Sequence, residues 1–178
     1  MILSVCGQDK SSEIKQLFKL TFSDSEGESE GMLIANLVED LMASRDQEDI
    51  LCFKAIESNE IIACIFFSRL TFEYNVNAFL LSPVAVHTDH QGKGVGQALI
   101  NFGLNALREK GVELVLTYGD INFYSKVGFK VIDEKVVKAP WELTYPEGWL
   151  GQALNGGEIT QVPGNSFCVE AFNNPKYW

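Results

Sequence analysis

The stretch VAVHTDHQGKGVG, from Val84 to Gly96, is the most informative part of the sequence. It joins an apolar strand to the start of a helix through a short polar loop, in which glycines flank a single lysine. Glycine lets successive backbone N–H groups point at one anion, and the N-terminus of a helix adds partial positive charge. The stretch therefore predicts a binding site for a diphosphate group.

Two common phosphate-binding loops do not fit these letters. A P-loop needs Ser or Thr after its glycine and lysine, whereas Gly94 is followed by Val95 and Gly96. A dinucleotide fingerprint that begins at Gly92 needs a glycine at position 97, where Gln97 stands. Both nucleotide interpretations are therefore rejected.

The loop instead resembles the acetyl-coenzyme A loop of the GNAT acetyltransferase superfamily. The family pattern is Gln or Arg, two residues, Gly, any residue, then Gly or Ala, and Gln91, Gly94 and Gly96 match it. Farther along, GDINFYSKVGF at Gly119 to Phe129 resembles the YhbS-like branch of these N-acetyltransferases, as does the IFFSRL strand at 65–70. The two motifs occur in the expected order and separation, so they carry more weight than the loop alone.

The resemblance implies an α/β (α+β) protein with the GNAT-like acyl-CoA N-acyltransferase fold. Its core would be a central mixed, mostly antiparallel twisted sheet flanked by helices, with a C-terminal extension. Hydrophobic periodicity places helices around residues 14–22 and 34–41, separated by an acidic, glycine-bearing stretch from Ser23 to Gly31. Strands are expected at 2–5, 51–57, 61–70, 79–86, 112–117 and 129–132, with a short helix at 122–126.

Three details of this pattern can be tested. Ser58 and Asn59 would join two strands as a hairpin turn. Pro83 cannot donate a ladder hydrogen bond, so it predicts a bulge or an interruption of pairing in its strand. The helix after the loop would end at Gly111 and bury one face, made of Val95, Ala98, Leu99, Phe102 and Ala106.

Composition predicts one domain with an elaborated end. The 178 residues are 46% hydrophobic, enough for one core of ordinary size. All three tryptophans and four of the five prolines follow residue 132. We therefore expect a GNAT-like domain over 1–132 and a C-terminal elaboration over 133–178 that packs on the same domain and buries its tryptophan rings.

The net charge and the hydropathy of the sequence limit the classes of molecule that the protein is expected to bind. Fourteen basic against 24 acidic residues give a net charge of −10, which disfavours nucleic acid and anionic membranes. The acidic surface suits a cationic acceptor, although it serves solubility equally well. No basic leader or membrane-length apolar run occurs in the sequence, so a soluble cytoplasmic protein is expected. Exposed aromatic residues of the C-terminal segment would suit a homodimer contact.

The cysteines predict no metal site. Cys6, Cys52, Cys64 and Cys168 show no paired C-x-x-C spacing and no grouping with either histidine. We expect neither a zinc site nor a disulfide framework, and interpret the four as small buried apolar residues.

The resemblance assigns the cofactor-binding residues. Main-chain groups of Val84, Ala85 and Val86 would bind the pantetheine arm and polarise the thioester carbonyl. The diphosphate would be held by Gln91, Gly92, Lys93, Gly94, Val95, Gly96 and Gln97. Two side chains keep an alternative: Lys93 is either a phosphate ligand or a solvated lysine, and Asn122 contacts either the pantetheine or the start of its helix.

Tyr124 is the predicted catalytic residue, because the family places a tyrosine of this segment near the coenzyme sulfur. A phenol with a pKa of ~10 can protonate a departing thiolate with a pKa of ~8.5. The alternative is a tyrosine that only packs against the coenzyme. Glu73 and His87 are candidates for the general base, which stays unassigned. The acidic residues Asp24, Glu26, Glu28 and Glu30 would either line a solvated loop or meet a cationic acceptor.

The implied function is transfer of an acetyl group from acetyl-CoA to a primary amine, on a small molecule or a protein, by direct transfer in a ternary complex. An alternative is a CoA-binding regulatory or interaction module of the same fold without turnover. No metal cofactor is expected, and the sequence identifies neither the acceptor nor a different acyl group.

Overall fold

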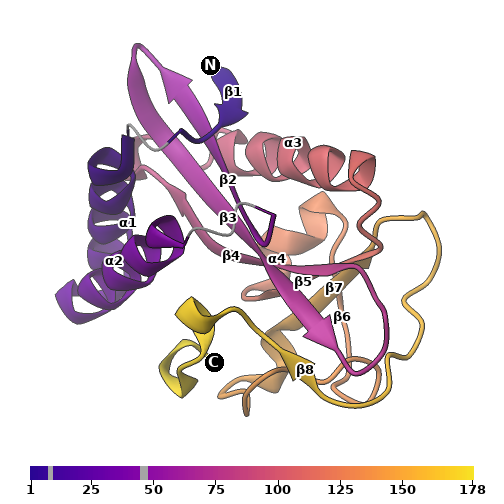
Figure 1. Cartoon of the computed structure of the whole chain (residues 1–178). Helices are drawn as coiled ribbons and strands as arrows, with labels where there is room; N and C mark the ends of the chain where they lie inside the picture. Colours follow the sequence, from indigo (N-terminus) through magenta and orange to yellow (C-terminus); the bar gives the residue numbers. More distant parts are fainter. Residues whose placement is uncertain (8–9, 45–47) are drawn as a thin grey trace. The chain divides into compact units, whose positions relative to one another are not determined.

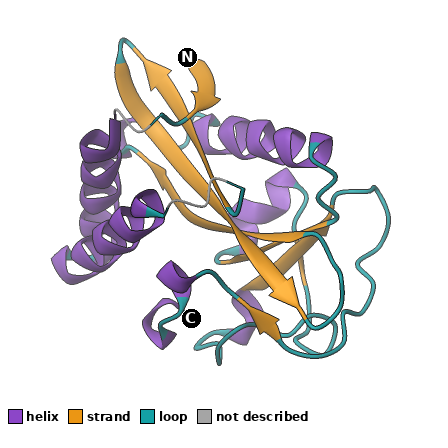
Figure 2. Cartoon of the chain, viewed as in Figure 1, coloured by secondary structure: helices purple, strands orange, loops and turns teal. Residues whose placement is uncertain are grey.

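The computed structural model describes residues 1–7, 10–44 and 48–178. The chain forms two compact units. The first unit contains residues 1–67 and 83–103, and the second contains residues 68–82 and 104–178. Figure 1 labels the elements, and Figure 2 shows which are helices and which are strands.

Two helices of the first unit pack side by side (Figure 1). Helix α1 (Ser11–Glu26) and helix α2 (Glu28–Ala43) are separated by Gly27 alone, whose φ is +100°. The expected acidic loop is therefore wrong, because one glycine with a left-handed backbone is enough to turn the chain. The acidic residues 28 and 30 instead occupy the first turn of α2, where the helix dipole favours negative charge.

The strands of the first unit begin at the N-terminus. β1 (Ile2–Val5) pairs antiparallel with β2 (Ile50–Glu57). β2 continues into β3 (Glu60–Phe72) through Ser58 and Asn59, whose φ angles are +50° and +67°. Two consecutive left-handed residues are the signature of a type I′ turn, so the predicted hairpin is confirmed.

Strand β4 (Ala78–Val86) leads into helix α3 (Val95–Glu109), and Gly111 follows that helix with a φ of +73°. The buried face of α3 differs from the predicted one. Phe102 is 36% exposed, whereas the buried apolar residues are Val95, Leu99, Ile100, Leu104 and Leu107. Gly103 also belongs to the buried face, since a Cβ there would lie 2.5 Å from the Phe67 ring. The predicted face is therefore right for Val95 and Leu99 and wrong for Phe102, and it missed Gly103 because a glycine carries no hydrophobic signal.

In the second unit, a strand from the C-terminal part of the chain lies between two strands that precede it in the sequence. β5 (Leu114–Tyr118) pairs in parallel with β4 and antiparallel with β7 (Trp149–Ala153). The other edge of β7 pairs with β6 (Lys130–Val131), so β5 and β6 are separated by a strand from farther along the chain. β8 (Ser166–Phe167) pairs with the end of β3. Helix α4 (Ile121–Tyr124) and short 3-10 turns complete the unit.

Along the described chain, hydrogen bonding orders the strands β1-β2-β3-β4-β5-β7-β6, with β8 added at β3. The sheet is mixed and mostly antiparallel, as predicted. Two tryptophans are buried, Trp149 at 0% and Trp178 at 4% exposure, whereas Trp141 is 37% exposed. Within the described residues, no helix is both long and apolar enough to cross a membrane.

Candidate active site

Strand β4 leaves its parallel partner halfway along. Among the described residues, its ladder with β5 joins Ala78–Leu81 to Leu114–Thr117, whereas β4 itself continues to Val86. The ladder ends two residues before Pro83, which cannot donate a hydrogen bond. The predicted interruption of pairing at the proline therefore agrees with this register.

The loop after β4 is held by its own glutamine. Gln91 donates from Nε2 to the Val86 carbonyl at 3.0 Å, which ties the loop back to the end of the strand. The intervening residues Thr88–His90 form one 3-10 turn, and the His90 N–H donates to the His87 carbonyl at 2.8 Å. The glutamine of the predicted motif thus shapes the loop, a role that its spacing alone did not reveal.

The glycines of the loop need their left-handed backbone. Gly92 and Gly94 have φ angles of +72° and +80°, and a Cβ built on either would have no described atom within 4 Å apart from its own residue and chain neighbours. Helix α3 opens here, because the Ala98 N–H donates to the Gly94 carbonyl at 3.0 Å. The amides that precede Ala98 cannot make a bond of this kind within the helix. Open space beside free helix-terminal amides fits the diphosphate that the sequence predicts.

The residues of this stretch differ in how far they are exposed to solvent. Gln91 and Lys93 are exposed, while Val95 and Gly96 are buried at the start of α3 and Ala85 is buried in β4. Val84, Val86 and Gln97 are half-buried. Lys93 therefore stands in solvent beside the glycines, a position compatible with both of its predicted roles.

The end of α1 contacts the same loop. Thr88 donates from Oγ1 to Asp24 Oδ2 at 2.8 Å, so one of the acidic residues is bonded to the segment that precedes Gln91. Partial burial and the neighbouring Glu30 raise the pKa of Glu26 above its ordinary value. His87, a candidate base, is 42% exposed, and its Nδ1 accepts a hydrogen bond from the Asp89 N–H at 3.3 Å.

Tyr124 belongs to the second unit, where it is half-buried and its ring has close neighbours. Gly119 lies against one edge of the ring, and the rings of Phe123 and Phe129 pack on it at centroid distances of 5.0 and 5.7 Å. Burial raises the pKa of the Tyr124 phenol, and a hydrogen bond with the Thr117 side chain acts in the opposite direction. The phenol thus stays protonated at neutral pH, as a general acid must.

Two residues around Tyr124 were missed from the sequence. Thr117 is fully buried, and its hydroxyl donates to the Leu81 carbonyl at 2.8 Å across the β4–β5 pair. Asp120 caps α4 by accepting the Asn122 N–H at 2.9 Å. To predict the role of Thr117, one must know which strands are neighbours. To predict that of Asp120, one must know where the short helix α4 begins. Hydrophobic periodicity gives neither kind of information.

Two other candidate site residues have side chains that hydrogen-bond to neighbouring residues. The Asn122 side chain donates from Nδ2 to Asp120 Oδ1 at 2.9 Å, which is the helix-start contact of its two predicted alternatives. Glu73, in the second unit, is exposed and accepts a hydrogen bond from Asn165 at 3.0 Å. Glu73 is thus held by a residue of the C-terminal segment.

The prediction of buried apolar cysteines without a disulfide is wrong for two of the four. Cys6 and Cys52 are half-buried and form a disulfide, whereas Cys64 is buried and free as predicted, with its sulfur beside both. The prediction failed because these residues gather across neighbouring strands, whereas C-x-x-C spacing detects only local pairs. Cys168 is a half-buried free thiol.

Known proteins resemble the chain in sequence. Residues 48–131 match the acetyltransferase (GNAT) domain family. The uncharacterized N-acetyltransferase YjhQ of Escherichia coli K12 is 29% identical over 170 residues, which cover 91% of this chain and 90% of YjhQ. The uncharacterized N-acetyltransferase YhbS of the same strain is 33% identical over 61 residues, which cover 34% of this chain and 36% of YhbS.

Solved structures share the fold. The E. coli GNAT N-acetyltransferase YhbS, solved in complex with CoA, superposes with a TM-score of 0.77 at 22% identity, covering 97% of this chain and 92% of YhbS. A GNAT family acetyltransferase from Brucella melitensis, solved in complex with acetyl-CoA, gives 0.72 at 23% identity and covers 97% of each chain. Residues 48–131 therefore match the GNAT acetyltransferase domain family, and the chain has the fold of the solved GNAT acetyltransferases.

Proposed function

We propose that this protein transfers an acetyl group from acetyl-CoA to a primary amine, directly and within a ternary complex. The observation that carries the proposal is the backbone of the loop before α3. There, Gly92 and Gly94 hold left-handed φ angles with open space beside them, at the N-terminus of a 15-residue helix. The match of residues 48–131 to the GNAT domain family supports the coenzyme diphosphate as the ligand of that loop.

The loop would bind the diphosphate through its main chain. N–H groups of Gly92 to Gln97 would donate to phosphate oxygens, supported by the partial positive charge of the α3 N-terminus. Lys93, exposed next to the glycines, would add a cation. Gln91 would act indirectly, because its hydrogen bond to the Val86 carbonyl keeps the loop in shape.

Strand β4 would bind the pantetheine arm. Its residues 84–86 lie beyond the ladder with β5, so their main-chain groups on that edge are proposed to serve the ligand. One N–H would polarise the thioester carbonyl, as an oxyanion hole does. Bound acetyl-CoA supplies an activated acetyl carbon and a thiolate leaving group.

Tyr124 would protonate that thiolate. Its raised pKa keeps the proton on the phenol at neutral pH, and Gly119, Phe123 and Phe129 fix the ring. Removal of a proton from the acceptor amine is left to water or an unassigned base, because an alkylamine of pKa ~10.4 is mostly protonated at pH 7. The net charge of −10 favours a cationic acceptor.

Ligand-induced stabilisation tests the proposal. A ligand that binds only the folded state raises the free energy of unfolding by RT ln(1 + [L]/Kd), so the melting temperature is measured with acetyl-CoA, ATP and NAD. We expect a shift with acetyl-CoA alone, followed by thiol release with a panel of primary amines. Absence of any shift at saturating acetyl-CoA would refute the proposal. A shift without thiol release from any amine would leave a CoA-binding module.

A further inference from the structure

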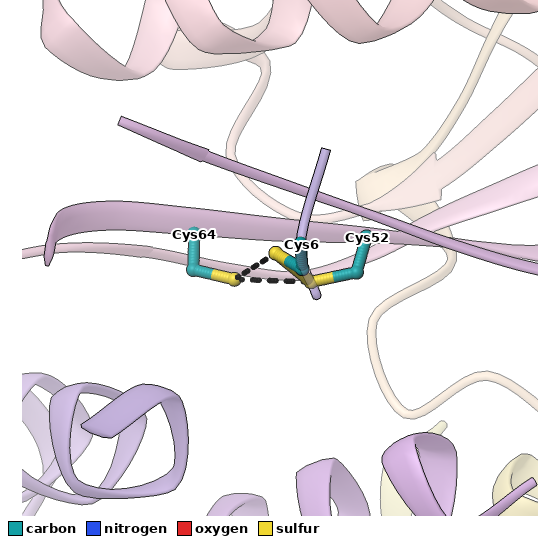
Figure 3. A group of neighbouring side chains, drawn as sticks. All are labelled: Cys6, Cys52 and Cys64. Carbon is teal, nitrogen blue, oxygen red and sulfur yellow. Dashed lines mark hydrogen bonds between the residues drawn. A yellow bond between two sulfur atoms is a disulfide. The ribbon is translucent and has the colours of Figure 1, made fainter. Parts of the chain in front are cut away.

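Three cysteines from three neighbouring segments of the sheet meet in the first unit (Figure 3). Cys6 directly follows β1, Cys52 lies in β2, and Cys64 lies in β3. Their sulfur atoms all lie within 4.8 Å of one another. The backbone supports the arrangement, since the Cys6 N–H donates to the Cys52 carbonyl at 2.8 Å.

The spacing of the sulfurs suits one shared metal ion. Zinc–thiolate bonds of about 2.3 Å in a tetrahedron place neighbouring sulfurs about 3.8 Å apart. Cys64 Sγ lies 3.8 Å from Cys6 Sγ and 3.4 Å from Cys52 Sγ. The third edge is occupied by the Cys6–Cys52 disulfide, so the site exists only after this bond is reduced.

A cavity of about 370 Å³ gives access to the cluster. Cys6 and Cys52 line it, together with Val5, Gly7, Leu41, Met42, Ser44, Ile50, Leu51 and Phe66. These described residues offer thiols and a thioether but neither a carboxylate nor an imidazole. Thiolate ligands select Zn²⁺ or Cu⁺, whereas Mg²⁺ and Ca²⁺ prefer carboxylate and carbonyl oxygens.

A buried lysine supplies compensating charge. Lys54, two residues after Cys52, is 8% exposed. Residues two apart in a strand have side chains on the same face of the sheet, so Lys54 shares the face of β2 that carries Cys52. Three thiolates with one divalent ion carry a net charge of −1, which the lysine would neutralise.

We propose that Cys6, Cys52 and Cys64, in their reduced form, bind one thiophilic cation, Zn²⁺ or Cu⁺. A dithiol first reduces the Cys6–Cys52 disulfide to two thiols and is itself oxidised to a disulfide. The cation then binds three sulfurs and displaces their three protons. The bound ion would cross-link the start of the chain to β2 and β3, a structural role independent of acetyl transfer.

Metal stoichiometry tests this site. The full-length protein is reduced with a dithiol, freed of it without oxygen, and dialysed against Zn²⁺ alone or Cu⁺ alone. We expect about one ion per chain, in one arm or in both, and a rise in melting temperature with that ion. Less than about one fifth of an ion per chain in both arms, or a disulfide that mass spectrometry still detects after reduction, would overturn the proposal.

Single substitutions localise the ion. Cys64→Ser should weaken binding by more than about tenfold, since even second-shell changes cost that much. Cys168→Ser is the matched control, a free thiol outside the cluster, and should bind as the parent does. Cys52→Ser repeats the test at a half-buried position in case Cys64→Ser does not fold. Unchanged binding in both cluster variants, or equal loss in Cys168→Ser, would contradict the assignment.

Discussion

Gly119 lies so close to Tyr124 that a β-carbon at position 119 would stand 2.7 Å from Cε2 of the tyrosine ring. The glycine directly follows β5, and the tyrosine ends the short helix α4. The absence of a side chain at one residue therefore sets the position of the phenol at the other.

Gly119→Ala should displace the Tyr124 ring. We expect a loss of about 1–3 kcal/mol in the free energy of unfolding, the usual cost of overpacking, together with a fall in acetyl-transfer rate. Gly157→Ala is the control, because its β-carbon would meet only the Asn155 side chain, at 3.2 Å. Urea denaturation and steady-state kinetics of both variants measure the effects. Parental stability and rate in Gly119→Ala would show that the ring is not held there.

Tyr124→Phe removes the proposed general acid and leaves the ring in place. We expect kcat to fall by about 10²–10⁴-fold, the usual contribution of general acid catalysis, while KM for acetyl-CoA changes little. Initial rates of thiol release give both constants. A kcat within about twofold of the parent would assign Tyr124 a packing role only.

The same variant should change the alkaline stability. Because burial raises the folded-state pKa of Tyr124, the unfolded phenol, with a pKa of about 10, loses its proton first. The stabilising effect is complete below about pH 10 and is lost as the pH rises through the folded-state pKa. The free energy of unfolding between about pH 8 and pH 11 should therefore fall less in Tyr124→Phe than in the parent. Equal slopes would contradict burial of the phenol.

Gly94→Ala separates backbone strain from ligand binding. Gly94 and Gly156 have φ angles of +80° and +79°, and among the described residues only the chain neighbours would lie within 4 Å of a Cβ on either. Alanine should therefore cost a similar 1–2 kcal/mol or so of stability at both positions. Only Gly94→Ala should lose the thermal shift produced by acetyl-CoA. A full shift in Gly94→Ala, or an equal loss in Gly156→Ala, would remove this loop from the binding site.

Gly103→Ala tests the contact between α3 and β3. The new β-carbon would lie 2.5 Å from Cε2 of Phe67, a buried ring, and 3.3 Å from Cδ1 of Ile65. We expect about 1–3 kcal/mol of destabilisation in chemical denaturation. Asn101→Ala, on an exposed position of the same helix, should be neutral or slightly stabilising. If Gly103→Ala were as stable as the parent protein, α3 and β3 could move apart without a loss in the free energy of unfolding.

Local patterns predicted the elements better than their contacts. The hairpin at Ser58 and Asn59 follows from two strand-like runs with two residues between them, and the helix end at Gly111 follows from the cost of a left-handed backbone in other residues. The break between α1 and α2 was predicted too long, because charged residues occur both in loops and on helix surfaces. Gly27 alone carries the turn.

Contacts across strands could not be predicted, because they depend on register. Cys6, Cys52 and Cys64 are separated by 46 and 12 residues, and they meet only because their strands are neighbours. Thr117 reaches the Leu81 carbonyl for the same reason. In the candidate site, the glycine loop carried a local signature, whereas the surroundings of Tyr124 did not.

The place of β7 between β5 and β6 has a consequence for biosynthesis. A ribosome releases residues 114–118 and 130–131 before 149–153, yet the two earlier strands each pair with the later one. Until that segment emerges, a nascent chain exposes the apolar edge of β5, which is open to chaperones or to other nascent chains. A stall in translation after β5 has left the ribosome and before residues 149–153 have left it should therefore make this protein prone to aggregate.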